Sequence, residues 1–467
     1  MTDLDAGRLA PADPCLADYR GFVLAKSQLA GCAGFEPVFQ HPKAYDFQGA
    51  LVDWSVRQGR GAIFADCGLG KTLMQMTWAQ NVVEHTNKPV LIIAPLMVSM
   101  QTSEEAAKFD FDARRSKDGK FGTGAKIVTT NYDQLHNFDP DDFGGVVCDE
   151  SSAIKNFEGA RKTEITEFMR LCRYRLLCSA TPSPNDYVEL GTSSEALGQL
   201  GYMDMLAMFF KNDEDSLHPM SMGSQWRFKT HAQKDFWRWV CSWARAVRKP
   251  SDLGFDDGPF ILPALVENEH VVESVVREGE LFAMTAANLH EERQERRATL
   301  EARCAKAAEL LAGDEPGIAW CHLNAEAERL VEAMPGAMQL SGTDHPDRKE
   351  EIFNAFRSGQ LRKLVTKPKI AALGLNFQHC NRMTYFADHS FEQYYQAVRR
   401  SWRFGQKRPV TVDVITSEGL SGVTKNLKRK SLAAEEMFRV MVEQMNDALG
   451  LRRFHEHTNT QELPSWL

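Results

Sequence analysis

The 467-residue chain lacks several features that would assign it to a special class of protein. Its ten cysteines include no Cys-x-x-Cys pair, which favours reduced thiols over a zinc site or a disulfide framework. The apolar run Pro89–Met100 is too short to cross a bilayer, and the acidic opening Met1–Asp5 lacks the basic-then-apolar pattern of a secretion signal. These absences predict a cytoplasmic protein with no membrane partner.

The charge balance lacks the strong basic excess that marks many nucleic-acid-binding proteins. The sequence has 55 Lys and Arg against 63 Asp and Glu, a net charge of -8, so a site for a polyanion has to be a local patch. Hydrophobic residues at 43% and charged residues at 25% are near the globular average, which excludes wholesale disorder. The length suits two domains of about 200 residues or three smaller ones.

Two sets of short apolar or β-branched runs alternate with longer helical patterns, which is typical of βαβ units around a buried parallel sheet. The predicted fold class is therefore α/β, with two parallel-sheet lobes. The first set of expected strands is Gly61–Ala65, Val90–Ala94, Lys126–Thr130, Gly145–Cys148 and Tyr174–Ser179. The second set is Gly317–Cys321, Met338–Leu340, Leu361–Thr366, Arg382–Phe386 and Val410–Ile415.

The stretch between the two sets has a different composition. From Gln225 to Pro250 it holds seven Arg or Lys against one acid, with aromatic rings between them. Apolar side chains recur there at helical spacing, which predicts a helix with its rings toward a core, while the flanking basic residues stay candidates for DNA contact. These residues are Phe236, Trp239, Val240, Trp243 and Val247. The charged segment Leu289–Leu311 is predicted to be a solvated amphipathic helix.

The expected domains are an N-terminal extension (1–40), a first lobe (41–190), a helical aromatic and basic insertion with a linker (191–262), and a second lobe with C-terminal helices (263–467).

The segment Ala65–Thr72 follows a strand and opens a helical pattern, as a phosphate-binding loop requires. Gly68 and Gly70 let backbone amides curl around phosphates, Lys71 can reach the β and γ groups, and the Thr72 hydroxyl can ligate Mg²⁺.

An acidic pair, Asp149–Glu150, ends the expected strand Gly145–Cys148. Such a pair alone is usually a solvated loop or a helix N-terminus. On the same sheet as a phosphate loop, however, the pair would point into the crevice where α/β sheets bind ligands. Asp149 is then placed to hold Mg²⁺, and Glu150 to orient and deprotonate an attacking water.

A basic cluster lies in the second set, at Gln396–Gln406. Arg400 and Arg403 are three residues apart, so they share one helical face and can reach a polyphosphate held by the other lobe. Arginines in that position stabilise the charge that develops on a γ-phosphoryl group. The cluster alone fits a solvated basic helix or a DNA-backbone patch equally well, and the companion motifs favour catalysis.

In this order, the motifs resemble those of helicase superfamily two, and within it the Swi/Snf-type double-stranded DNA translocases, over about Phe47–Thr416. Gln48 looks like the adenine-reading glutamine, Ala65–Thr72 like the ATP loop, and Asp149–Asn156 like the acidic motif, whose Ile-Lys-Asn tail favours this subgroup over RNA helicases. The other matching segments are Ala94–Leu96, Thr129–Tyr132, Ser179–Pro182, Leu340–Gly342, Gly374–Asn376 and Gln396–Gln406. Ser151–Ser152 and Lys367–Ala372 depart from the family pattern.

The resemblance implies two RecA-like lobes that bind ATP and Mg²⁺ between them and move along duplex DNA as a compact, monomeric bacterial or phage motor. It assigns backbone contacts with DNA to Ala94–Leu96 and Thr129–Tyr132. It also assigns the coupling of hydrolysis to lobe movement to Ser179, Thr181, Gln396 and Gln406. An RNA or single-strand helicase on the same scaffold and a non-catalytic DNA-binding scaffold remain alternatives, and a nuclease or other DNA-processing partner is left open.

Overall fold

The computed structural model describes residues 34–155, 159–183, 186–212, 226–274, 285–286, 288–371 and 376–458. The expected extension 1–40 therefore lies outside the described residues except for 34–40. Asn156, Gly374 and Leu375, from the predicted motifs, also lie outside them. None of the described helices is both long enough and apolar enough to span a bilayer.

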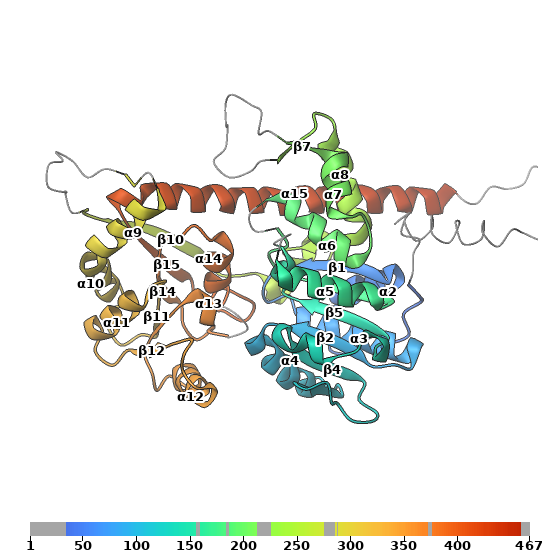
Figure 1. Ribbon diagram of the computed structural model, residues 1–467, viewed down its shortest axis with the longest axis horizontal. Helices are drawn as coiled ribbons and strands as arrows, with labels where there is room; N and C mark the ends of the chain where they lie inside the picture. Colours follow the sequence, from blue (N-terminus) through green and yellow to red (C-terminus); the bar gives the residue numbers. More distant parts are fainter. Residues whose placement is uncertain are drawn as a thin grey trace, which may run out of the picture.

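The first lobe is built on a seven-stranded sheet in the order β3-β4-β2-β5-β6-β1-β9, in which every neighbouring pair is parallel (Figure 1). Its strands are β1 (Arg60–Ala65), β2 (Val90–Ala94), β3 (Ala113–Arg115), β4 (Ile127–Asn131), β5 (Gly145–Asp149), β6 (Tyr174–Cys178) and β9 (Ala244–Val247). Its helices are α2 (Asp46–Gln58), α3 (Lys71–Thr86), α4 (Leu96–Lys108), α5 (Ala160–Leu171), α6 (Leu190–Leu197), α7 (Tyr202–Phe209) and α8 (Ala232–Trp243).

Strand β1 shows why this sheet is buried on both faces. Successive side chains of a strand point to opposite faces, so Ala62 and Phe64 join one apolar cluster while Ile63 and Ala65 join the other. All four are fully buried. Continuous apolar runs of this kind form the centre of a parallel sheet covered by helices on both sides.

The second lobe is a six-stranded parallel sheet in the order β10-β15-β14-β11-β13-β12. Its strands are β10 (Leu265–Val272), β11 (Gly317–Trp320), β12 (Met338–Leu340), β13 (Lys363–Thr366), β14 (Arg382–Phe386) and β15 (Val410–Ser417). Its helices are α9 (Leu289–Ala298), α10 (Leu300–Leu310), α11 (Asn324–Ala333), α12 (Pro346–Arg357), α13 (Pro368–Ala371), α14 (Phe391–Val398) and α15 (Ser421–Thr458). The predicted two-lobe α/β fold is confirmed, and all ten expected strands are present within two residues of their predicted ends.

The stretch 191–262 differs from its prediction because it contains strands as well as helices. Helix α8 places Phe236, Val240 and Trp243 in the first-lobe core, as their spacing predicted, and Trp239 packs against that core partly buried. Trp237, outside that spacing, is buried there as well. The helical pattern does not continue to Val247, however, because Ala244–Val247 forms the edge strand β9 beside β1. A short antiparallel hairpin, β7 (Phe210–Asn212) with β8 (Trp226–Phe228), completes this stretch.

Helix α15 joins the two lobes. It begins after β15 in the second lobe and runs along both lobes (Figure 1). Met437, Phe438 and Met441 are buried in the first-lobe core, and the Met441 carbonyl accepts a hydrogen bond from the Cys241 thiol of α8. The last described helix of the chain is therefore part of the core of the first lobe.

Candidate active site

The predicted phosphate loop connects β1 to α3. Gly68 and Gly70 have φ values of 91° and 79°, in the left-handed region that glycine adopts without strain. A Cβ atom on Gly70 would lie 2.3 Å from Gln48 Nε2, so a side chain at this position would also displace the Gln48 amide. Gly70 precedes the first residue of α3, so unbonded backbone N–H groups of the first helical turn lie at this loop, as an anion site requires.

Gln48, on α2, is bonded to this loop. Its Nε2 donates to the Leu69 carbonyl at 2.8 Å, and its Oε1 accepts from the Tyr45 backbone at 3.0 Å. The side chain is only 3% exposed. In this arrangement Gln48 supports the loop through its Nε2, while its Oε1 binds the backbone at the start of its own helix. Its predicted contact with adenine stays a prediction.

Lys71 lies across the mouth of the same loop. Its Nζ donates to the Ala65 carbonyl at 3.0 Å and reaches the Asp66 carbonyl at 3.5 Å. These are single hydrogen bonds to neutral carbonyls, which a phosphate oxygen would replace with a stronger, charge-assisted bond.

Asp149 and Glu150 stand at the carboxyl end of β5, next to the loop. Asp149 Oδ1 accepts hydrogen bonds from Gln75 Nε2 at 2.7 Å and from the Glu150 backbone at 3.0 Å. Burial, and then the neighbouring Glu150 carboxylate, raise the pKa of Asp149 above its usual range. An Mg²⁺ ion bound there would oppose that shift, because its charge would compensate the two carboxylates.

Glu150 combines backbone strain with an unpaired oxygen. Its φ of 51° is in the left-handed region, which costs a non-glycine residue free energy and which folded proteins retain mostly at functional sites. Its Oε2 is buried and has no hydrogen-bond partner among the described residues. Both observations suit a carboxylate held ready for a ligand or a water molecule.

Arg400 and Arg403, from the second lobe, line the same cavity as Lys71, Asp149 and Glu150. The cavity measures about 90 Å³ and is also lined by Cys67, Gly68, Gly70, Thr72, Val98 and Thr102. The two lobes touch beside it, because a Cβ atom on Gly68 would lie 2.9 Å from the Phe404 backbone nitrogen. Burial lowers the pKa of Arg400, and Arg403 Nε is buried with no hydrogen-bond partner among the described residues.

The cavity is small for a nucleotide. Sites for small molecules usually enclose about 300–1,000 Å³, several times the 90 Å³ found between the arginines and the loop. The donor set nevertheless fits a magnesium-bound triphosphate, since it combines a carboxylate, a hydroxyl, a lysine and two arginines. A nucleotide would therefore have to enter while the lobes are further apart.

The four predicted coupling residues are all buried but have different surroundings. Ser179 Oγ accepts from the Thr181 backbone at 3.0 Å, and Thr181 Oγ1 has no partner among the described residues. Gln406 Nε2 donates to the Gln378 carbonyl at 2.9 Å, inside the second lobe. Gln396 lies on α14. Thr181 alone of these four lines a second cavity between the lobes.

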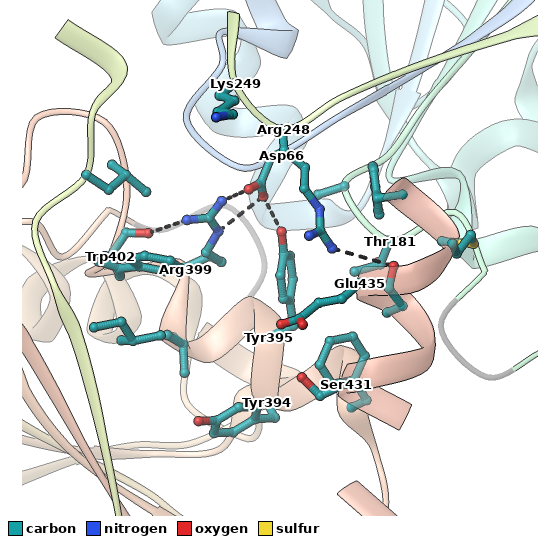
Figure 2. Close-up of a pocket in the computed structure, with 18 of the residues that line it drawn as sticks. Asp66, Thr181, Arg248, Lys249, Tyr394, Tyr395, Arg399, Trp402, Ser431 and Glu435 are labelled. Atoms are coloured by element: carbon teal, nitrogen blue, oxygen red, sulfur yellow. Dashed lines mark hydrogen bonds and ion pairs between the residues drawn. The ribbon is translucent and has the colours of Figure 1, made fainter. Parts of the chain in front are cut away.

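The second cavity, which we call the interlobe cavity, measures about 470 Å³ and lies between both lobes and α15 (Figure 2). On one side of it, Arg399 forms an ion pair with Asp66 of the phosphate loop, and the Tyr395 hydroxyl donates to the same carboxylate. Sequence reasoning missed this contact. Asp66 was visible inside the loop motif and Arg399 inside the basic cluster, but no local pattern pairs them.

The segment Thr129–Tyr132, which the resemblance assigns to DNA contact, is buried instead. Thr129, Thr130, Asn131 and Tyr132 are each at most 5% exposed. The Asn131 side chain accepts from the Asp133 backbone, and the Tyr132 hydroxyl donates to the Asp149 carbonyl. These side chains support the strand ends, and the predicted contact of this segment with DNA stays a prediction.

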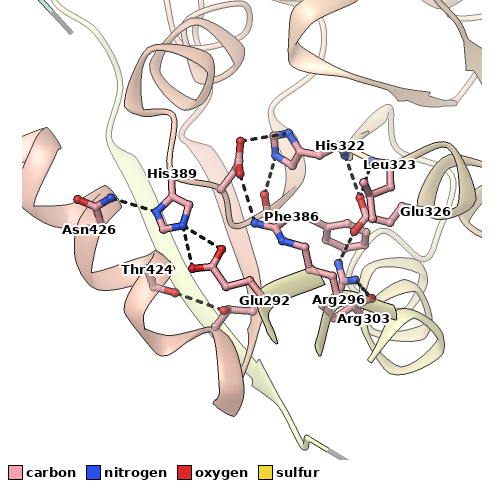
Figure 3. A network of polar contacts seen from close by, with 12 residues as sticks. Glu292, Arg296, Arg303, His322, Leu323, Glu326, Phe386, His389, Thr424 and Asn426 are labelled. Carbon is pink, nitrogen blue, oxygen red and sulfur yellow. Dashed lines mark hydrogen bonds and ion pairs between the residues drawn. The ribbon is translucent and has the colours of Figure 1, made fainter. Parts of the chain in front are cut away.

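A separate buried network occupies the carboxyl end of the second sheet (Figure 3). Arg303 Nη1 donates to Glu326 Oε1 at 2.7 Å, and both side chains are at most 1% exposed. Arg296 pairs with Asp388 at 3.2 Å. The prediction of one solvated helix over Leu289–Leu311 is therefore wrong, because the segment is two helices and its Arg296 and Arg303 are buried and paired with carboxylates.

Comparisons with known proteins find a match to a family model within the second lobe. Residues 305–405 match the family model of the helicase conserved C-terminal domain. The chain is also similar to a solved structure, the Sulfolobus solfataricus SWI2/SNF2 ATPase core in complex with dsDNA, at 17% identity and a TM-score of 0.42, over 88% of this chain and 99% of that one. No curated protein matches it. The predicted resemblance to helicases is thus confirmed for the second lobe, whose residues 305–405 are similar to the helicase conserved C-terminal domain.

Proposed function

We propose that this chain is a nucleic-acid-dependent ATPase that uses ATP hydrolysis to move along double-stranded DNA. The observation that supports it most directly is the shared cavity: Arg400 and Arg403 of one lobe line the same space as Lys71 and Glu150 of the other. The likeness of residues 305–405 to a helicase C-terminal domain supports the same function. A kinase or GTPase would account for the loop but not for arginines supplied by a second lobe.

Each lobe then has a defined part in hydrolysis. The loop amides and Lys71 bind the phosphates, while Thr72 and Asp149 would hold Mg²⁺, which neutralises phosphate charge when bound. Glu150 orients the attacking water and accepts its proton. Arg400 and Arg403 stabilise the negative charge that develops on the γ-phosphoryl group.

The position of this cavity between the lobes supports movement along nucleic acid as the result of hydrolysis. ATP holds the lobes in one spacing and product release allows another, so each cycle shifts the second lobe relative to the first. The Ile154–Lys155 part of the acidic motif favours duplex DNA as the partner, as in the subgroup that the motif resembles. An RNA or single-strand helicase is the closest alternative.

The direct test is ATP hydrolysis by the purified chain with duplex DNA, single-stranded DNA and RNA. We expect duplex DNA to stimulate the rate most, and stronger stimulation by RNA would favour the alternative. Lys71→Ala should abolish DNA-stimulated hydrolysis, because the β and γ phosphates lose their lysine. Wild-type turnover in that variant would reject the assignment of Lys71 to the phosphate site. No phosphate release by the wild-type protein would instead reject the ATPase function and favour a non-catalytic scaffold.

A second variant separates binding from chemistry. Glu150→Gln keeps the shape of the side chain but cannot accept the proton, so we expect it to bind ATP while kcat falls about 10²- to 10⁴-fold. Binding is measured with a fluorescent ATP analogue and hydrolysis by phosphate release. Glu167→Gln, at an exposed position of α5, is the matched control and should hydrolyse ATP at the wild-type rate.

A further inference from the structure

The two lobes are joined by a buried ion pair that the proposed chemistry does not use. Arg399, at the end of α14, donates through Nε to Asp66 Oδ1 at 3.1 Å, and its Nη2 pairs with Asp66 Oδ2 (Figure 2). The Arg399 side chain is 5% exposed and that of Asp66 is 7% exposed. Two groups so well removed from water hold a fixed geometry, since either one left alone would be an uncompensated buried charge.

Further contacts fix both partners in place. The Tyr395 hydroxyl donates to Asp66 Oδ1, and the Cys67 backbone donates to the same oxygen at 2.6 Å. Arg399 Nη1 donates to the Trp402 carbonyl at 3.1 Å, and its guanidinium lies 4.6 Å from the centre of the Trp402 ring. The guanidinium and the carboxylate are therefore both oriented from more than one side, so the pair has one defined arrangement.

The pair lies next to the two arginines of the shared cavity. Arg399 directly precedes Arg400, and successive backbone hydrogen bonds run from Arg400 to Ala397 and from Arg403 to Ser401. The Arg400 carbonyl also accepts from the Phe377 backbone at 2.9 Å. In this tight turn, the anchor of Arg399 on the phosphate loop sets where Arg400 and Arg403 stand relative to that loop.

We infer that the Asp66–Arg399 pair is a latch between the lobes, and that Arg399 is a positioning residue that aligns Arg400 and Arg403 with the phosphate loop. The inference rests on the proposed ATPase function and deepens it. The other end of α14 is also held by the first lobe, because Lys155 pairs with Glu392. Helix α14 is thus fastened to the first lobe at both ends, with the phosphate loop at one of them.

The latch gives a specific kinetic expectation. The lobes stand closed around a cavity of about 90 Å³, so ATP has to enter a more open form and the closed form has to be restored for hydrolysis. Loss of the latch leaves the binding groups of the first lobe intact but lets the arginines move away. A misplacement of about 1 Å at a catalytic group costs on the order of 100-fold in rate.

The test compares Arg399→Gln, Asp66→Asn and the double variant. Asp66→Asn keeps an oxygen that can accept the hydrogen bond of the Cys67 backbone, so the structure of the loop is retained. We expect each single variant to lower kcat about 100-fold, with the dissociation constant for a fluorescent ATP analogue changed less than about threefold. The double variant should be no slower than either single variant, because each substitution removes the same interaction between Asp66 and Arg399.

A control variant and a measurement of the shape of the protein complete the test. Arg408→Gln removes an arginine from the same segment, where its Nη2 donates to the His379 carbonyl of its own lobe, and it should keep wild-type kcat. Small-angle X-ray scattering without nucleotide should give a larger radius of gyration for Arg399→Gln than for the wild-type protein and for Arg408→Gln.

The latch is rejected if kcat of Arg399→Gln is unchanged, if the two single effects multiply in the double variant, or if ATP binding weakens in parallel with kcat. Those results leave the ATPase function standing, since the wild-type protein still hydrolyses ATP. Absence of hydrolysis in the wild-type protein would instead reject the proposed function, and the scattering comparison would then test the latch alone.

Discussion

The carboxyl ends of the two sheets both bury charged side chains, but they satisfy them differently. In the second lobe, Arg303 and Glu326 are fully paired and hydrogen-bonded. In the first lobe, Glu150 Oε2 and Ser151 Oγ are buried with no partner among the described residues, and Glu150 is strained as well. Buried polar groups normally find partners, so the contrast separates a structural network from a site prepared for a ligand.

The largest expected effect is on the chemistry of the first-lobe site. Arg403→Ala should bind ATP nearly normally but lose about 10³- to 10⁵-fold in kcat, because the arginine acts on charge that appears only in the transition state. Single-turnover hydrolysis with bound duplex DNA measures this loss. An effect confined to KM would contradict the role across the lobes, and Arg408→Ala serves as the control in the same segment.

The second expected effect is on stability, at the satisfied network. Burial acts to raise the pKa of Glu326, but Arg303 and two backbone N–H donors outweigh it, so its pKa lies below the usual value. Glu326→Gln should lower the free energy of unfolding at neutral pH by about 3–5 kcal/mol, since Arg303 is left buried and unpaired. This contribution is present above the carboxylate pKa of the unfolded chain and is lost as the pH falls through the lower folded value.

Urea denaturation across pH measures the effect at Glu326. The matched control is Glu301→Gln, which breaks the exposed Arg329–Glu301 pair, whose side chains are 42% and 67% exposed. We expect that control to leave stability nearly unchanged, because water already solvates both charges. Equal losses of unfolding free energy in Glu326→Gln and Glu301→Gln would show that burial does not make the first ion pair more important for stability than the second.

The smallest expected effect has the opposite sign. The folded pKa of Asp149 lies above that of the unfolded chain, so the folded state loses stability as the pH rises from the unfolded value through the folded one. Asp149→Asn removes this cost and keeps an oxygen for Gln75, and it should stabilise the nucleotide-free protein at neutral pH by on the order of 1–3 kcal/mol. Thermal unfolding measures this stabilisation, with Asp142→Asn as a control at an exposed position. A lower unfolding temperature of Asp149→Asn would contradict the contrast between the first-lobe site and the second-lobe network.

The sequence predicted the parts of the fold that depend on local pattern. β-Branched runs such as Val90–Ala94 are buried on both faces, so their composition identified them directly. Strand β10 was missed, because its segment Leu265–Val272 is a partly exposed edge strand with polar residues at its centre. Strand β9 was missed because Ala244–Val247 follows a helix without a break and becomes a strand only by pairing with β1.

The candidate site shows the same division. Lys71, Asp149, Glu150, Arg400 and Arg403 were predicted one motif at a time, and the structure brings them to one cavity, although their roles stay predictions. The partner of Asp66 could not be predicted, since three arginines stand close together in the basic segment and only the docking of the lobes selects one. In the same way, a run of charges does not reveal which of them, like Arg303, will be buried.

The position of α15 has a consequence for the order of biosynthesis. Met437, Phe438 and Met441 fill the first-lobe core, yet they leave the ribosome more than three hundred residues after β1. Until they emerge, the nascent first lobe exposes the apolar side of α8 that they later cover. Chains interrupted before residue 437 would therefore have a first lobe with an exposed apolar surface that favours aggregation. That lobe would nevertheless contain its whole phosphate loop.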